Sequence, residues 1–225
     1  MSDPSAQPAQ PQVLSGIDVS HFQNAVDWAA VAGAGIAFAY AKASDGGTVS
    51  DPQFAANWAG MKAAGVLRGA YHFFRPATSA QAQADHFAQL VGALAPGDLP
   101  PMLDIEETGT ATSPEQWAAV AVAARVPLVV TWLERVEAAL GLRPILYTRA
   151  GFIEKYFPDP GELTAYRLWV AHYTSQPAPN LPPGWDDWTL WQFSETGKVA
   201  GVTGAVDLDR FNGTLDDLRA LALPA

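Results

Sequence analysis

The sequence predicts an α/β fold, a reduced TIM-like (β/α) barrel of eight strands surrounded by about five helices. Apolar β-type runs alternate with Ala-rich helical segments, the pattern of parallel strands joined by helices. The helical signal fades after the fifth strand, and the 225 residues fall short of the ~250 that a full barrel usually needs. A composition of 49% hydrophobic and 16% charged residues supports one folded domain with a sizeable core.

Eight runs rich in β-branched, aromatic and other apolar residues predict the strands. They cover residues 13–20, 35–44, 66–74, 99–107, 143–148, 167–173, 188–194 and 205–211. Helical segments separate the first five runs, so we expect parallel strands joined by crossover helices. Loops rich in Pro, Gly and Asp, with little helical signal, join the last three runs.

Capping residues mark the first two predicted helices. Asp27 opens a short helix over 27–34. In the next helix, we expect Asp51 as N-cap, Pro52 at the first helical position and Gly65 as the stop.

The remaining helical segments are predicted from their Ala-rich, periodic pattern. They lie at residues 78–93, 113–141, 150–156 and 214–223. The segment 113–141 starts at Ser113 and Pro114 and forms either one long helix or two, kinked or broken at Pro127.

The charge and the absent cysteines exclude several function classes. A net charge of −10 makes binding to nucleic-acid phosphates improbable and argues weakly against docking on an anionic membrane, although solubility alone would also explain it. Without cysteine there is no disulfide, thiolate chemistry or Cys-ligated zinc. The four histidines show no i, i+4 pair, so we expect no metal and no cofactor.

The first 15 residues differ in composition from the rest. They are rich in Pro, Gln, Ala and Ser and lack the basic and apolar regions of a secretory signal, so 1–15 is predicted to be a disordered leader. No apolar run approaches the ~20 residues that span a bilayer. We expect a single catalytic barrel domain over 16–225, without a second domain, acting as a monomer.

Acidic residues follow apolar runs at the ends of three predicted strands. Asp18 ends the first, Asp104 and Glu106 end the fourth, and Asp207 lies in the last, with Asp209 two residues later. Charges inside a barrel are costly except at the carboxyl ends of the strands, where barrel enzymes keep their active sites. The sequence therefore predicts one acidic site at this rim.

Asp104 and Glu106 are two residues apart, so along a strand they share a face with Cα atoms roughly 6.5–7 Å apart. Two carboxylates this close repel, and the one in the drier setting keeps its proton. The result is a general acid beside an ionised carboxylate, the pair that cleaves glycosidic bonds. One isolated D-x-E is more often the start of a solvated loop or a helix N-cap than a catalytic pair, but acids on three strand ends favour a site.

Aromatic residues in or beside the strands strengthen this interpretation, because aromatic faces bind sugar rings. The set comprises Tyr71, Phe73, Tyr147, Trp169, Tyr173, Trp191 and Phe193, and part of it is expected to be ordinary core.

Three polar residues have a structural interpretation beside the functional one. We expect His72 to be a hydrogen-bonded core histidine and Asp209 to fix the closing loop. Lys42 either forms an ion pair with Asp18 or Asp45 or contacts a ligand.

Several motifs, in order, resemble the glycoside hydrolase family 25 lysozymes, the Chalaropsis-type muramidases. "GIDVSHFQNAVDWAAVAGAGIAFAYAKASDG" is similar to the family's opening, and "GAYHFFRP", "PMLDIEE", "PILYT", "LWVAHY", "LWQFS" and "VDLDRFNG" are similar to its later strands. The resemblance runs from about Gly16 to Gly213. It implies hydrolysis of the β-1,4 bond between N-acetylmuramic acid and N-acetylglucosamine in peptidoglycan, on an eight-stranded barrel with fewer than eight helices.

The resemblance also implies roles for individual residues. Glu106 corresponds to the general acid/base and Asp104 to its partner carboxylate, either as nucleophile or orienting the substrate's own N-acetyl group. Both routes imply net retention. Asp18 and Asp207 would line the same groove, and the implied substrate contacts are Tyr71, Tyr147, Lys42, Gln192, Tyr173 and Trp169.

Two departures from the family pattern stand out. Where the family commonly has an aromatic residue, Gln and Gly, this chain has Phe22, Gln23 and Asn24. Where it commonly has Glu in K-A-T-E-G, this chain has Asp45, which puts a groove role for that carboxylate in doubt.

Two other functions compete with a muramidase. One is a catalytically silent barrel that binds cell-wall glycan, since fold alone does not establish chemistry. The other is a hydrolase of chitin-like polymers, which typically show a longer D-x-D-x-E run that is missing here. The expected partner is bacterial peptidoglycan, reached in the periplasm or outside the cell. Without a signal peptide, release by lysis, a secretion system or processing would be needed.

Overall fold

A computed structural model describes residues 13–224. Its strands lie close to the predicted runs: β1 Leu14–Val19, β2 Phe38–Asp45, β3 Val49–Ser50, β4 Leu67–Phe73, β5 Met102–Asp104, β6 Ile145–Thr148, β7 Arg167–Ala171, β8 Leu190–Gly197 and β9 Val206–Phe211. Only the two-residue β3 was not predicted. The leader expected over 1–15 lies largely outside the described residues, and β1 already includes its last two positions, so the predicted boundary is two residues late.

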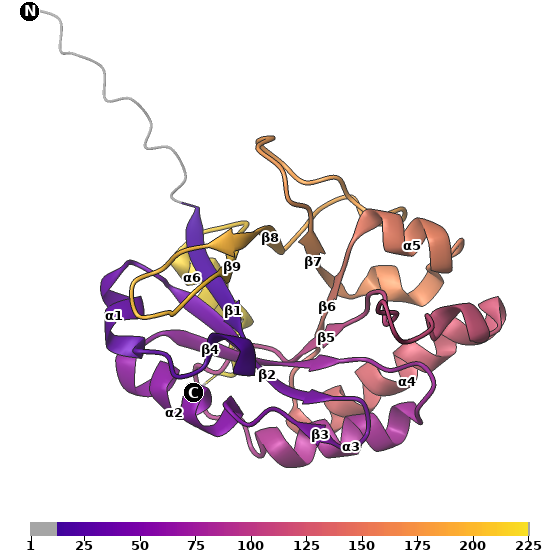
Figure 1. Cartoon of the computed structure of the whole chain (residues 1–225), viewed down its shortest axis with the longest axis horizontal. Coiled ribbons are helices and arrows are strands. Elements are labelled where there is room, and N and C mark those ends of the chain that lie inside the picture. The colour runs from indigo at the N-terminus through magenta and orange to yellow at the C-terminus, as the bar shows by residue number, and fades with distance from the viewer. Residues whose placement is uncertain (1–12, 225) are drawn as a thin grey trace, which may run out of the picture.

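Eight of these strands form a closed barrel, which confirms the predicted fold class (Figure 1). The sheet order is β1-β9-β8-β7-β6-β5-β4-β2-β3, and pairing of β1 with β2 closes it. Neighbours from β1 through β2, β4, β5, β6 and β7 to β8 run parallel. The expectation of an all-parallel barrel is wrong for β9, which runs antiparallel to β8 and β1. Residues 198–205 are too few for a crossover, so β8 and β9 pair antiparallel.

Helices lie between the strands as far as β7, none lies between β7, β8 and β9, and a last helix follows β9, as predicted. The barrel is covered by α1 Trp28–Gly33, α2 Phe54–Ala64, α3 Ala80–Val91, α4 Val122–Leu140 and α5 Ala150–Tyr156 (Figure 1). Neither the 172–189 nor the 198–205 connection contains a helix. Among the described residues, no helix is long and apolar enough to cross a membrane.

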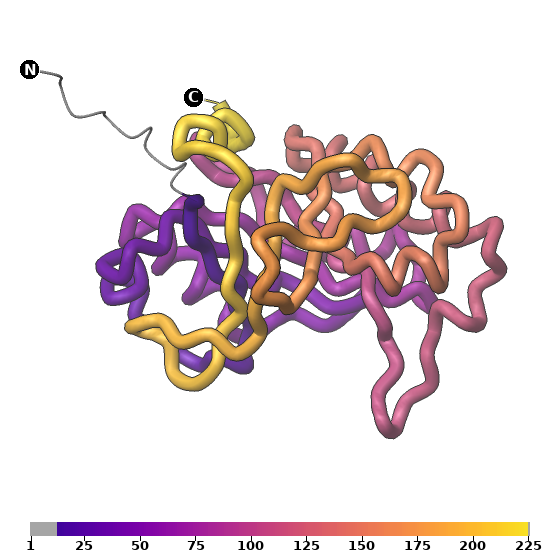
Figure 2. The backbone as a smooth tube through the Cα atoms, turned by 90° about the horizontal axis from the view of Figure 1, so that it is seen from above, coloured from indigo at the N-terminus to yellow at the C-terminus, as the bar shows by residue number. Residues whose placement is uncertain are grey.

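Large rings fill the inside of the barrel below the acidic rim. Phe38 and Tyr40 of β2 point inward and are buried, together with Trp169 and Phe211. Gly69 makes room for one ring, since a Cβ there would lie 2.2 Å from Tyr40. The final helix α6, Leu215–Leu221, lies at the barrel end opposite the acidic rim (Figure 2). Its Leu218 belongs to the same buried cluster.

Two helix starts differ from the prediction. Gln53, not Asp51, is the N-cap of α2. The Asp51 carboxylate accepts from the Gln53 backbone N–H with Oδ1 and binds His21 with Oδ2. The long segment does not start at Ser113: the turn Trp117–Ala119 comes first, and α4 begins at Val122. α4 continues through Pro127 as one helix. Fully buried side chains on its later turns, such as Trp132 and Leu133, hold it against the core.

Candidate active site

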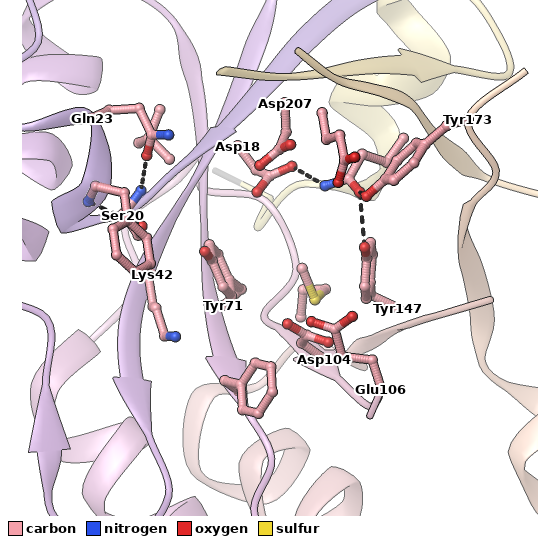
Figure 3. Close-up of a pocket in the computed structure, with 16 residues that line it drawn as sticks. Asp18, Ser20, Gln23, Lys42, Tyr71, Asp104, Glu106, Tyr147, Tyr173 and Asp207 are labelled. Carbon is pink, nitrogen blue, oxygen red and sulfur yellow. Dashed lines mark hydrogen bonds between the residues drawn. The ribbon is translucent and has the colours of Figure 1, made fainter. Parts of the chain in front are cut away.

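A cavity of about 320 Å³ opens at the barrel end where the parallel strands finish (Figure 3). It contains the four acids predicted to form one site. Its lining consists of Asp18, Val19, Ser20, Phe22, Gln23, Lys42, Tyr71, Phe73, Met102, Asp104, Glu106, Tyr147, Tyr173, Gln192, Glu195 and Asp207.

Asp104 ends β5 and Glu106 follows it by two residues, with their carboxylates side by side and pointing into the cavity (Figure 3). Asp104 is buried, and its Oδ1 has no hydrogen-bond partner. The Glu106 backbone is fixed by Trp117, whose Nε1 donates to the Glu106 carbonyl at 2.9 Å. The predicted shared face is therefore present.

The surroundings raise the pKa of both carboxyl groups in this pair. Burial raises the pKa of Glu106 to about 7, with Glu107 adding to the rise and Arg149 opposing it. Burial and the charge of Glu106 raise the pKa of Asp104 as well. The two carboxyl groups are coupled, so ionising one hinders the other.

Asp18 and Asp207 form a second acidic pair, directly opposite each other on β1 and β9. Burial and Asp207 raise the pKa of Asp18, and burial raises the pKa of Asp207 to about 6, with a further contribution from Glu195. Asp207 reaches the rim because β9 is antiparallel and begins there. The prediction placed it correctly, but the assumed strand direction was wrong.

Gln192 connects the second pair to two tyrosines. Its Nε2 donates to Asp18 Oδ2 at 2.6 Å, and the hydroxyls of Tyr147 and Tyr173 both donate to its Oε1 at 2.8 Å (Figure 3). Because Gln192 is itself buried, it supports the site from beneath.

Five of the six residues implied as substrate contacts line the cavity: Tyr71, Tyr147, Lys42, Gln192 and Tyr173. Trp169 does not. It is fully buried inside the barrel, where its Nε1 donates to Asp209 Oδ1 at 3.2 Å. The prediction that Trp169 touches a sugar is therefore wrong, because its position on β7 lies one layer below the rim.

The structure also shows the surroundings of the three polar residues that had a structural and a functional interpretation. Lys42 Nζ lies 3.3 Å from Asp45 Oδ2, which is one of the expected ion pairs, and its side chain also lines the cavity. His72 is a core residue, since it is fully buried between Ser44 and Gln83 and burial lowers its pKa to about 3. Asp209 does not fix a loop, because its buried side chain faces the barrel interior.

A second cavity, of about 490 Å³, continues from the first and shares Glu106, Tyr147, Tyr173 and Glu195 with it. Beyond these shared residues it extends to Arg149, His172 and Asn180. Asp104, Asp18 and Asp207 line only the first cavity, so Glu106 lies where the two meet.

Phe22, Gln23 and Glu195 line the site but were not predicted as site residues. Glu195 carried a readable signal, an acid just after the "LWQFS" strand. Within residues 13–224, no three His, Cys, Asp or Glu side chains are arranged to hold a metal ion.

The loop after β1 contains one strained position. Asn24 has φ 54° and ψ −144°, a conformation that glycine adopts far more readily than any other residue. We expect Asn24→Gly to stabilise the fold by about 1 kcal/mol, because relief of strain exceeds the added chain entropy. Chemical denaturation measures it, with Asn24→Ala as the control, which should not stabilise. A glycine variant less stable than the parent would contradict the strain.

Comparisons with known proteins agree with this geometry. The model of glycosyl hydrolases family 25 matches residues 17–202. The chain belongs to this family. Lysozyme M1 of Streptomyces globisporus is 38% identical over 96% of this chain and 73% of its own, and N,O-diacetylmuramidase of Chalaropsis sp is 31% identical over 93% and 99%.

The solved structures give the same result. A bacterial lysozyme from Streptomyces coelicolor superposes with a TM-score of 0.87 at 38% identity, covering 93% of this chain and 96% of its own. The expected family and enzyme class are thereby confirmed, and the chain is a family 25 lysozyme.

Proposed function

We propose that this family 25 lysozyme hydrolyses the β-1,4 bond between N-acetylmuramic acid and N-acetylglucosamine in bacterial peptidoglycan, with net retention. The observation that carries the proposal is the Asp104–Glu106 pair in the cavity, with the pKa of Glu106 raised by burial to about 7. The names of its relatives, lysozyme and N,O-diacetylmuramidase, support this bond as the target.

Glu106 acts first as acid and then as base. It gives its proton to the glycosidic oxygen as the bond to muramic acid C1 breaks, which releases the glucosamine hydroxyl. The resulting carboxylate then takes a proton from the water that adds to C1. Glu106 lines both cavities, a position that suits contact with the glycosidic oxygen between two bound sugars.

Asp104 acts on the sugar in the first cavity. Either its carboxylate attacks C1 directly, or it orients the substrate's N-acetyl group, whose carbonyl oxygen attacks instead. Each route inverts C1 twice and so retains configuration. Asp18, which accepts a hydrogen bond from Gln192, and Asp207 line the same space and present hydrogen-bonding groups to the bound ring.

Activity should fall as the pH rises through about 7. The general acid works only while it holds its proton, and burial raises the pKa of Glu106 to about 7. The basic limb of kcat/KM measured on peptidoglycan from pH 5 to 9 reports this group in the free enzyme. A basic limb above pH 9 would assign the proton to another residue.

Digestion of purified peptidoglycan tests the proposal directly. Release of reducing ends separates a lysozyme from a silent glycan-binding barrel. Mass analysis of the new ends should find muramic acid, whereas glucosamine there would reassign the bond. Early NMR spectra of the product anomer test retention.

The substrate also implies where the chain acts. Peptidoglycan lies in the bacterial cell wall, so the chain would work in the periplasm or outside the cell. We propose that one copy is sufficient, since both cavities are formed within a single chain.

A further inference from the structure

The wall of the first cavity includes an aromatic side chain that faces solvent. Phe22 is 76% exposed, the most exposed large apolar residue in the described part of the chain, and it lines the same cavity as Asp104 and Glu106. The His21 ring lies 4.2 Å from it, centroid to centroid, so the two rings form one surface. A single exposed apolar side chain is common on protein surfaces, so exposure alone does not indicate a binding role. The residues around Phe22 provide the further evidence.

Hydrogen bonds hold the turn His21–Gln23 in place on both sides. Ser20 and Gln23 cap it reciprocally, with the Ser20 N–H donating to Gln23 Oε1 at 2.9 Å. The Asp51 carboxylate binds the His21 backbone at 3.0 Å and Nδ1 at 2.8 Å, and Gln23 Nε2 donates to the Ala205 carbonyl at 3.2 Å. The strained backbone of Asn24 follows immediately. The backbone that carries Phe22 is therefore fixed beside the cavity.

The two cavities differ in their acids, and this gives the cleft a direction. Asp104, which acts on the sugar whose anomeric carbon reacts, lines only the first cavity, whereas Glu106 lines both. A general acid lies between the reacting sugar and its leaving group, so the second cavity takes the leaving group. Phe22 lines only the first cavity and so lies on the other side of the reacting bond.

We propose that Phe22, flanked by His21, is a stacking platform for a sugar ring on the non-reducing side of the cleaved bond. Phe22 follows Asp18 by four residues, a span of at most about 14 Å, so a neighbouring ring of the same polymer can reach it. The C–H face of a pyranose is the part of a glycan strand that suits an exposed aromatic ring. This inference rests on the proposed function.

The test compares Phe22→Ala with Phe22→Trp in the full chain. Kinetics are measured on glycan fragments of increasing length from purified peptidoglycan. The quantity compared is kcat/KM on long fragments divided by kcat/KM on the shortest fragments that are cleaved. For Phe22→Ala we expect this ratio to fall about tenfold, because an aromatic contact of typical strength is lost. The change should come mainly from a higher KM on the long fragments. Phe22→Trp should keep the ratio within about twofold of the parent. Val122→Ala, at a 53% exposed position outside both cavities, is the matched control and should behave as the parent.

Three results would overturn the platform. They are an unchanged ratio in Phe22→Ala, an equal loss on every fragment length, and a loss in Phe22→Trp as large as that in Phe22→Ala. These results differ from failure of the proposed function, in which the parent chain itself would release no reducing ends.

Discussion

Replacing Glu106 with Gln should lower turnover of peptidoglycan by at least about 10²-fold while the chain stays folded. Gln has nearly the same shape but cannot give a proton to the leaving oxygen or take one from water. The loss should appear in kcat, since substrate contacts with the rest of the cavity remain. Release of reducing ends at pH 5 to 6, where the parent holds the proton, is the measurement. A variant with near-normal release would remove Glu106 from this role.

The stability of the same variant provides an independent check. Burial raises the pKa of Glu106 from 4.5 to about 7, so the folded chain holds this proton more tightly than the unfolded chain. The stabilisation from this group is present below about pH 4.5 and is lost as the pH rises through about 7. The Tm of Glu106→Gln should therefore fall less than that of the parent between pH 5 and 8. Glu134→Gln, at an exposed site on α4, is the control and should change neither turnover nor this slope.

Replacing Asp104 with Asn should also lower turnover by at least about 10²-fold, whichever route operates. A neutral amide is a poor nucleophile and cannot stabilise the positive charge that develops on an N-acetyl group during attack. Burial and the charge of Glu106 raise the pKa of Asp104, and one of its oxygens has no hydrogen-bond partner, so the Asn variant should fold. Wild-type rates in this variant would contradict any direct role.

A further variant separates the two routes. If Asp104 is the nucleophile, Asp104→Ala should regain turnover when a small anion such as azide is added, with inversion in the azide product. If the N-acetyl group attacks, azide should have no effect, and removal of the substrate's acetyl groups should stop the parent enzyme. The first outcome is read from the anomer of the azide product, and the second from the rates of release of reducing ends.

Much of the fold was predictable because its signals are local. Each strand–helix unit carries its own apolar run and its own caps, as Asp27 and Gly65 show. A local signal failed where tertiary packing was stronger: burial of its later turns carries α4 through Pro127, where a kink or break was expected.

The acids were predictable for a similar reason. Charged residues after apolar runs are costly anywhere but the rim, so Asp18, Asp104 and Glu106 could be assigned to one end of the barrel before any coordinates. Asp207 was assigned there too, although the true reason, the antiparallel β9, was not apparent.

The depth of each side chain in the barrel, and its exposure to the cavity, depended on how the barrel closes. Trp169 and Tyr147 look alike as aromatic residues on neighbouring strands, yet Trp169 is fully buried below the rim and Tyr147 lines the cavity. The two residues are register partners on β6 and β7, so the difference comes from the tilt of strands in a closed barrel, which no single segment encodes. The pattern along the chain was sufficient for the elements and the acid pair, because both arise from neighbouring residues. The side chains that face the cleft, Phe22 among them, were decided by packing between strands distant in the sequence.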